Sequence, residues 1–317
     1  LTERTVENTG TIVLAENYTL GTNSAFNAAT IDLSTHHLTV GTGGTSGSVT
    51  GNIINDTSLT FDRSNEYTFA GDISGTGQVI QNGTGVLTLS GDNTYSGDTN
   101  VNAGTLRIGS ANALSPNTTL FVDSDATFDP GGFAQRVARL SGTGDINVGS
   151  GGLTVEPTSK NTFTGTLSGT GGLIKNGAGE LELTGTHTYS GQTQINAGHI
   201  RLTGSAASSA FRIENGGTLA GTGTLGSLTL ASGGTLAPGA SPGTLNAGDT
   251  IWNGGATFDF EIDNATGTQG TNWDLLAITG TLTINAIASN QFTLNVDTLL
   301  NGTDTAGLNT QFLQQTQ

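Results

Sequence analysis

Cysteine and methionine are absent from this chain of 317 residues, and proline occurs only 5 times. Without cysteine the chain has neither a disulfide framework nor thiol chemistry. Because no methionine stands at position 1, we expect that Leu1 is not a translation start. No apolar run approaches the roughly 18 residues that a membrane helix needs, so we expect no membrane span in this chain.

Basic residues are also scarce, with 9 lysines and arginines against 25 acids and a formal net charge of −16. Such a surface repels nucleic acid and anionic membranes, so we expect neither as a partner. The acidic excess is typical of a large exposed surface that must stay soluble.

Only 33% of the residues are hydrophobic, but they are not spread evenly. They recur in short alternating stretches such as GVLTLSG (85–91), ELELTG (180–185) and TGTLTINA (279–286), which is the period of a half-buried strand. Glycine and threonine, 50 and 56 residues, make up a third of the chain and favour bends and strands over helices. The sequence therefore predicts an all-β fold.

The chain also repeats itself. Residues 69–107 align with residues 163–201 without a gap and share 22 of 39 positions. The identical positions are mostly turn residues, such as NG at 82–83 and 176–177, while the apolar positions exchange within their class. The pattern indicates that inward packing is kept without any particular side chain being required.

Fainter repeats of about 20–25 residues fill the rest of the chain, which is the length of one coil of a β-solenoid. We expect residues 1–250 to form a β-solenoid, with repeats near 60–110 and 155–205. Residues 251–317 are expected to add C-terminal coils or an end cap to the same rod. The side chains expected to point inward are Ile73, Val79, Leu87, Leu89, Val101, Leu106 and Ile108, and in the second copy Leu167, Leu173, Leu181, Leu183, Ile195, Ile200 and Leu202.

The segment SGTG, followed by NGTGVLTLSGDNTYSGDTNVNAGTLRIG, resembles the autotransporter-associated β-strand repeat of bacterial passenger domains. The later segment GGTLAPGASPGTLNAGD (233–249) is similar to the sequence that often follows such repeats. The resemblance covers roughly residues 60–285. It implies a right-handed parallel β-helix that is exported to the bacterial cell surface or the extracellular space, and it implies no reaction.

Two stretches imitate functional motifs. Residues 239–243 (GASPG) fit the nucleophile motif G-x-S-x-G, and residues 221–226 (GTGTLG) fit the dinucleotide motif G-x-G-x-x-G. Both motifs work only where a helix follows, and the sequence continues with strand-like segments instead. Pro242 also lacks the N–H that an oxyanion hole would require. We interpret both stretches as turns and expect no catalytic or cofactor-binding residues.

A weak calcium candidate is formed by Asp123, Asp125 and Asp129, because carboxylate oxygens are the ligands that calcium prefers. The spacing does not fit an EF-hand loop. Strand alternation offers a simpler interpretation, in which Val122 and Phe128 point inward and the acids point to water. We therefore expect no metal and no cofactor.

The histidines and arginines of the repeats are interpreted as structural. His187 and His199 replace Asn93 and Thr105 of the first copy, so we expect both histidines at the surface. Arg107 and Arg201 occupy equivalent positions, where they could pair with the abundant acids or bind an acidic glycan.

These features predict a non-enzymatic, exported surface β-solenoid that acts as a structural rod, fibre subunit or adhesin. The alternative is an extracellular glycan-binding or glycan-degrading β-helix protein, because the same fold also carries enzymes. Such an enzyme would need a non-repeated loop with acids and aromatic residues. The nearest segments are residues 111–139, where the repeat lapses, and 251–275, which hold Trp252 and Trp273. These tryptophans could stack on sugars or plug the end of the apolar column.

Both ends of the chain look strand-like, at residues 9–20 and 291–300, and the tail 308–317 has no feature that would blunt an edge. The expected partners are like subunits stacked end to end or flanking parts of the chain's own precursor, with host or matrix glycans as a further possibility. The residues expected to take part in such assembly are Val13, Leu14, Phe292, Leu294 and Val296.

Overall fold

The computed structural model describes residues 4–239 and 241–299, and these residues form parallel strands joined by turns. No helix occurs among them, so none of the described residues belongs to a helix that could cross a membrane. The described residues divide into two compact units, the first of residues 4–156 and 164–171 and the second of residues 157–163, 172–239 and 241–299. The predicted all-β, parallel β-helix fold is confirmed.

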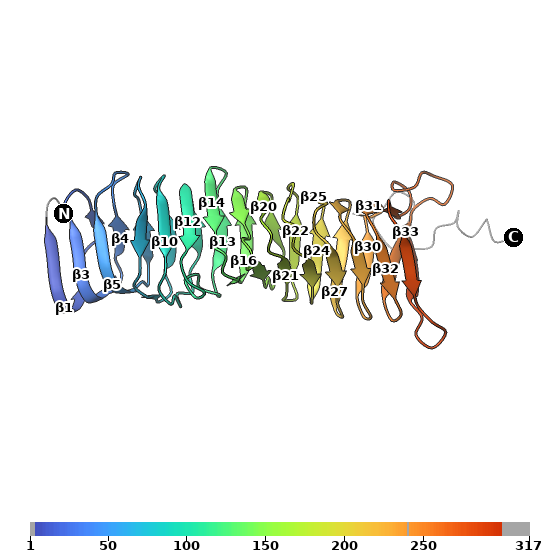
Figure 1. The fold of residues 1–317 in the computed structure, drawn as a ribbon, viewed down its shortest axis with the longest axis horizontal. Helices are drawn as coiled ribbons and strands as arrows, with labels where there is room; N and C mark the ends of the chain where they lie inside the picture. The colour runs from blue at the N-terminus through green and yellow to red at the C-terminus, as the bar shows by residue number, and fades with distance from the viewer. Residues whose placement is uncertain (1–3, 240, 300–317) are drawn as a thin grey trace. The chain divides into compact units, whose positions relative to one another are not determined.

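The first unit winds around three main faces (Figure 1). One face carries β1 (Thr5–Val13), β3 (Ala25–Asp32), β5 (Ser48–Ile54) and β8 (Ile73–Ser74), and then, as a further sheet, β15 (Gln135–Val137) and β18 (Leu153–Val155). The second carries β2 (Tyr18–Leu20), β4 (His37–Val40), β6 (Ser58–Phe61), β9 (Gln78–Gln81), β11 (Thr99–Val101), β13 (Thr119–Val122) and β16 (Arg139–Gly142). The third carries β7 (Tyr67–Phe69), β10 (Val86–Leu89), β12 (Gly104–Ile108), β14 (Ala126–Asp129), β17 (Asp145–Asn147) and β20 (Thr166–Ser168).

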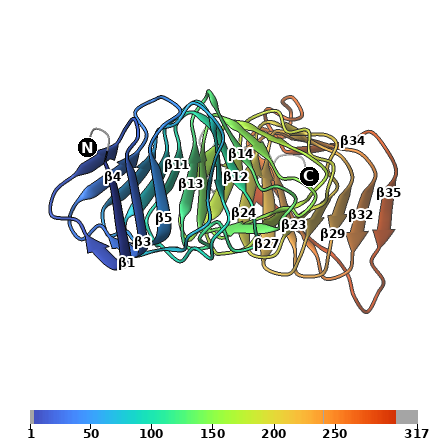
Figure 2. The same ribbon diagram turned by 60° about the vertical axis from the view of Figure 1, so that its left-hand side comes forward.

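The second unit is built in the same way, and Figure 2 shows its strands β29, β32 and β35 side by side. One sheet carries β19 (Asn161–Phe163), β22 (Glu180–Leu183), β24 (Gly198–Leu202), β27 (Gly217–Gly221), β30 (Thr235–Pro238), β33 (Thr257–Ile262) and β36 (Thr293–Thr298). Another carries β21 (Leu173–Lys175), β23 (Thr193–Ile195), β26 (Phe211–Ile213), β29 (Leu228–Leu230), β32 (Thr250–Asn253) and β35 (Leu282–Asn285). The third carries β25 (Ser205–Ala206), β28 (Thr224–Leu225), β31 (Thr244–Ala247) and β34 (Leu275–Ile278).

The core consists of ladders in which each coil places an apolar side chain on the one before it. In the first unit Leu87 pairs with Leu106, and Leu106 with Phe128. In the second unit the ladder starts with Leu181 on Ile200, and Leu219 and Leu236 extend it. All fourteen inward positions expected from the sequence are buried, so that prediction is confirmed.

Both sequence repeats also bury the same polar contacts. In the first copy the Tyr95 hydroxyl lies 2.6 Å from Thr99 Oγ1, which in turn lies 2.8 Å from Thr118 Oγ1. In the second copy Tyr189 lies 2.5 Å from Thr193 Oγ1, and Thr193 lies 2.9 Å from Ser209 Oγ. The shared TYSG segment therefore positions a tyrosine that holds a chain of hydroxyls across neighbouring coils.

The prediction that His187 lies at the surface is wrong. The side chain is buried beside Phe163, with ring centroids 6.3 Å apart, and burial lowers the pKa of His187 to about 4. Exchange with an asparagine did not imply exposure, because Asn93 is itself buried and accepts the Ile73 N–H at 2.8 Å. His199 is exposed, as expected.

Candidate functional site

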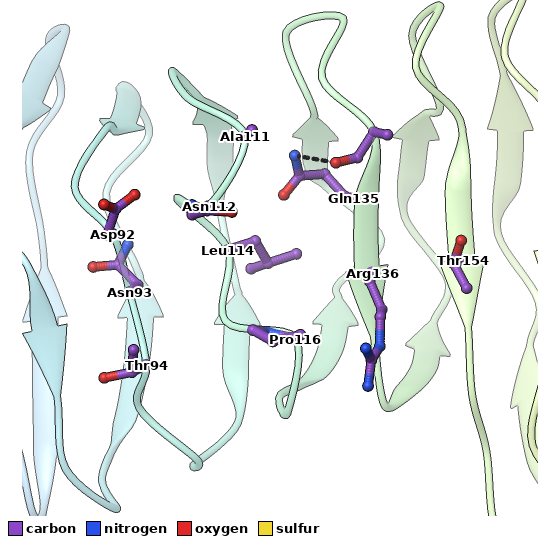
Figure 3. A pocket seen from close by; sticks show the side chains of 11 residues that line it. Asp92, Asn93, Thr94, Ala111, Asn112, Leu114, Pro116, Gln135, Arg136 and Thr154 are labelled. Atoms are coloured by element: carbon purple, nitrogen blue, oxygen red, sulfur yellow. Dashed lines mark hydrogen bonds between the residues drawn. The ribbon is translucent and has the colours of Figure 1, made fainter.

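A groove with a cavity volume of about 530 Å³ crosses four successive coils of the first unit (Figure 3). We call it the four-coil groove. It lies where the chain passes from the β10–β12–β14–β17 face toward the β11–β13–β16 face. Its lining residues are Asp92, Asn93, Thr94, Ala111, Asn112, Leu114, Pro116, Ala134, Gln135, Arg136 and Thr154.

The groove exists because the sequence repeat lapses at residues 111–139. The turn that follows β12 is anchored from inside, since Ser115 Oγ donates to Tyr95 O at 2.5 Å and Thr118 Oγ1 donates to Gly97 O at 2.9 Å. In the next coil β15 pairs with β18 on one side and is the first strand of its sheet. The other edge of β15 therefore faces the groove instead of a neighbouring strand.

Gln135 is the notable polar group of the groove. Its side chain is only 4% exposed, and its Nε2 donates to Ala134 O at 2.9 Å, whereas Oε1 has no hydrogen-bond partner. In Figure 3 the side chain extends from β15 toward the segment that carries Asn112 and Leu114. Most buried polar atoms are paired, so an unpaired acceptor on the wall of a groove indicates a missing donor.

The charged residues of the groove nearly cancel. Arg136 forms an ion pair with Glu156, with Nε 2.9 Å from a carboxylate oxygen, and this pair balances the positive charge of the arginine. Asp92 is the one acid that lines the groove. The side chain of Asn93 is already engaged, because it accepts the Ile73 N–H and donates to Ala113 O at 2.5 Å. The lining thus offers hydrogen-bonding side chains and one carboxylate, that of Asp92.

The calcium candidates lie at the β13–β14 turn and outside the groove. Asp123 and Asp125 are exposed, while a carboxylate oxygen of Asp129 lies 3.0 Å from Arg107 Nε. Within residues 4–239 and 241–299, no three His, Asp or Glu side chains gather in a metal-binding arrangement. Arg201 lies 3.6 Å from Glu180, so both repeat arginines pair with acids.

The five assembly candidates lie at the two ends of the described chain. Val13, Leu294 and Val296 are 61%, 53% and 45% exposed. Leu14 is buried, so its side chain is not part of an exposed face. Phe292 is half-buried, and its ring centroid lies 5.3 Å from that of Trp252. The tail 308–317 lies outside the described residues.

A smaller hollow of about 200 Å³ in the second unit gathers several acids. Its most buried member is Asp274, whose two carboxylate oxygens accept the Gly243 and Glu261 backbone N–H groups, each at 2.9 Å. Burial raises the pKa of Asp274 to about 7. Because both oxygens are held by backbone donors, Asp274 fastens the loop before β34 and is poorly placed for acid–base chemistry.

The tryptophans do not form a sugar-stacking platform together. Trp252 packs against Phe258 as well as Phe292, with centroids 5.3 Å apart in both cases. Trp252 pairs in register with Ile284 of β35, so a further coil lies over it and Trp252 itself does not end the apolar column. Trp273 is half-buried in the loop between β33 and β34.

Comparison with known families identifies the two sequence repeats. The model of the passenger-associated transport repeat matches residues 79–108 and 173–202, two stretches that start 94 residues apart and that form the equivalent coils described above. The chain therefore carries two copies of an autotransporter-associated β-repeat. The resemblance inferred from the sequence is confirmed, and these two stretches are called the passenger repeats below.

Several curated proteins resemble the region around the passenger repeats. The adhesin BmaC autotransporter of Brucella suis is 41% identical over 145 residues, which is 43% of this chain and 4% of that protein. An extracellular serine protease of Serratia marcescens is 37% identical over 142 residues, 42% of this chain and 13% of the protease. The autotransporter lipoprotein NalP of Neisseria meningitidis is 40% identical over 93 residues, 29% of this chain and 8% of that protein. The chain therefore matches only a small part of each relative's length.

Sequence reasoning singled out the segment 111–139 but not the residues that matter in it. Gln135 and Arg136 lie in that segment, whereas Asp92 and Thr94 come from a regular repeat two coils earlier. The one available signal was a glutamine at an inward position of the strand QRV (135–137), since a polar residue there must find a partner or leave an atom unpaired.

Proposed function

We propose that this chain is a non-enzymatic part of an exported bacterial surface protein, in which it serves as a scaffold and an adhesive surface. The observation that carries the proposal is the pair of passenger repeats, each built into the coil ladder of its unit. Relatives that share this region include an adhesin and two proteins with an extracellular or autotransporter designation. The acidic surface supports partners other than nucleic acid.

The groove supports the non-enzymatic part of the proposal. Its single acid, Asp92, is not accompanied by a histidine or a second carboxylate in the lining. A general acid that works with a separate general base, as in glycoside hydrolysis, needs a second carboxylate or a histidine within reach of the first. The serine protease relative matches over 13% of its own length, so its name does not carry its activity to this chain.

Surface labelling tests the proposal. Antibodies against the chain should label intact cells of the bacterium that produces it as strongly as permeabilised cells. Labelling that appears only after permeabilisation would contradict an exported role. In parallel, neutral and acidic polysaccharides and casein incubated with the purified chain should keep their length, and new reducing ends or peptides would contradict the non-enzymatic part.

We also propose that the chain stacks end to end with a second copy. Strand β1 has a partner only on the β3 side, and it exposes Val6 and Val13. At the other end β35 and β36 expose Leu282, Leu294 and Val296. An unpaired strand edge with exposed apolar side chains is a template for another strand. Because the two edges are unlike, their contact is heterologous and produces open filaments if the rotation does not close a ring.

Sedimentation velocity tests the stacking. The parent chain should form larger species as its concentration rises, and Val13→Lys should abolish them by replacing an exposed apolar side chain of the contact with a strongly hydrated charged one. The matched control is Ser124→Lys, which makes the same charge change on an exposed side turn and should assemble like the parent. A parent chain that stays a monomer at high concentration would overturn this proposal.

A further inference from the structure

We propose that the four-coil groove is a binding site for a neutral oligosaccharide, recognised through Gln135, Asp92 and the apolar floor beside them. The inference rests on the proposed surface function, which brings the groove into contact with extracellular glycans. It adds a site and a ligand class to that function.

The shape of the groove suits a short linear chain better than an ion or a single small molecule. It crosses four coils, and parallel strands lie about 4.8 Å apart, so three intervals give a length of roughly 14 Å. Its volume of about 530 Å³ falls within the range of sites that hold organic ligands, roughly 300–1,000 Å³. A ligand lying along it would touch side chains from every one of the four coils.

Gln135 specifies a hydrogen-bond donor in the ligand. Its amide orientation is fixed, because Nε2 donates to Ala134 O, and the reverse orientation would bring two oxygens together. Oε1 therefore stays an acceptor that has no partner, and leaving such a buried atom unpaired costs about 1–3 kcal/mol. Because Oε1 is itself buried, a ligand hydroxyl or amide N–H would recover that cost only once the side chain turns toward the groove.

The charges favour a neutral ligand. Asp92 adds a negative charge, and the ion pair with Glu156 occupies the cation of Arg136. An acidic sugar would therefore meet a carboxylate at one end of the groove and no unpaired lining cation, within a chain of net charge −16. The several hydroxyls of a neutral sugar, in contrast, can donate one to Asp92 and another to Gln135, and can accept from Asn112, Thr94 or Thr154.

The remaining lining is apolar. Leu114 is buried at the floor, and Pro116, Ala111 and Ala134 add aliphatic surface beside it. A pyranose ring offers C–H groups on one side and hydroxyls at its edge, so it can cover this floor while its hydroxyls reach the polar side chains. The open edge of β15 could instead accept an extended peptide. That alternative is weaker, because β15 has only 3 residues and Pro116 across the groove has no N–H to donate.

Titration by saturation-transfer NMR and calorimetry tests the inference. The probes are maltotriose, cellotriose and chitotriose as neutral sugars, 3′-sialyllactose and trigalacturonic acid as acidic sugars, and oligoalanine as a peptide. At least one neutral trisaccharide should bind, and the acidic sugars and the peptide should bind more weakly. Preference for an acidic sugar or the peptide, or no signal from any neutral sugar at millimolar concentration, would overturn the inference.

Gln135→Met separates binding from folding. Methionine keeps the approximate shape of the side chain but removes both the unpaired acceptor and the Nε2 donor to Ala134 O, so the melting temperature should change little, while affinity for the neutral sugar should drop about tenfold or more. Gln194→Met is the matched control, since it makes the same exchange on β23 of the second unit and should bind like the parent. Unchanged affinity in Gln135→Met would mean that Oε1 serves no ligand. If no sugar binds but antibodies still label intact cells, the proposed surface function stands and the sugar site is wrong. If labelling of intact cells fails, the surface function is wrong, and the titration still reports on the groove by itself.

Discussion

At the scale of single residues, most inward positions of the described coils exchange one apolar side chain for another. The apolar ladders replace leucine by isoleucine or phenylalanine from coil to coil, as in Leu87, Leu106 and Phe128. A ladder site is closed by the coils on either side of it, so a polar atom placed there has no route to water. The chemical class of an inward residue, rather than its identity, is what the fold requires.

Leu87→Asp in the first unit and Leu181→Asp in the second should each destabilise the chain by several kcal/mol, because both side chains are buried and a carboxylate there would be unpaired. Thr88→Asp is the control, since Thr88 points outward and pairs in register with Arg107. Urea unfolding followed by circular dichroism measures the difference. A Leu87→Asp variant as stable as Thr88→Asp would show that the strand face is assigned wrongly.

Lys175 is a charged residue whose side chain points into the otherwise largely apolar core. It is fully buried, and Nζ donates to three backbone carbonyls, those of Asn176 at 2.7 Å, Gly177 at 2.8 Å and Ala197 at 3.0 Å. Gln81 has the same place in the first copy, where Nε2 donates to Gly83 O and Gly85 O. Burial lowers the pKa of Lys175 from 10.5 to about 8. The turn therefore needs a donor at this position but not a charge.

Lys175→Gln should stabilise the chain at neutral pH and flatten its pH profile. Between about 8 and 10.5 the unfolded chain binds a proton at Lys175 that the folded chain does not, so stability should fall as the pH drops through this range and stay constant below it. The full effect is about 3 kcal/mol. Urea midpoints at pH values across that range measure it. Parallel profiles for the parent and Lys175→Gln would contradict the assignment.

At the scale of elements, turns rather than strands carry the repeat. Gly104 opens β12 with φ 60°, and a Cβ there would come within 2.4 Å of Gly85 O. Gly198 opens β24 with φ 63°, and a Cβ would come within 2.5 Å of Gly177 O. Glycine is required at both positions for two reasons, because the backbone is left-handed and because the preceding coil approaches too closely for a Cβ atom.

Gly104→Ala and Gly198→Ala should each cost at least about 1–2 kcal/mol, from the backbone conformation alone, with the carbonyl clash adding to it. Gly44→Ala is the control, because no atom lies within 4 Å of its Cβ position and its φ is not positive. Thermal unfolding measures all three variants. Equal melting temperatures for Gly104→Ala and Gly44→Ala would mean that the coils can move apart to accept the methyl group.

The sequence predicted the coils because period-two alternation and turn residues are local signals. It therefore placed Ile73 and Leu202 inside correctly. It missed His187, since a polar residue can also point inward when the turn around it is buried, as Asn93 does. The sequence pointed to the four-coil groove only through the lapse of the repeat at residues 111–139. Asp92 and Gln135 line the same groove only because their separate coils stack, and no local pattern encodes that arrangement.

At the scale of the molecule, we expect the described coils to be stable without a metal, since no three His, Asp or Glu side chains gather among them. The carboxylates that were calcium candidates either face water or, like Asp129, pair with arginine. We expect a chelator to leave the melting temperature of the chain almost unchanged. A fall of more than a few degrees on addition of EDTA, reversed by calcium, would instead assign the ion to Asp123, Asp125 and Asp129.

Charge should control end-to-end stacking. The two edge strands proposed to meet both carry exposed acids, Glu7 on β1 and Asp297 on β36, and the chain as a whole has a net charge of −16. Contact between them gains apolar burial and strand pairing but brings like charges together. Raising the salt concentration from about 10 mM to about 1 M shortens the Debye length from about 30 Å to about 3 Å and removes most of that repulsion. Sedimentation velocity should therefore show longer assemblies at high salt for the parent and Ser124→Lys, and none at either salt for Val13→Lys. Assemblies that dissolve as salt rises would mean that the ends are held by charge attraction, and the apolar, strand-pairing contact proposed here would be wrong.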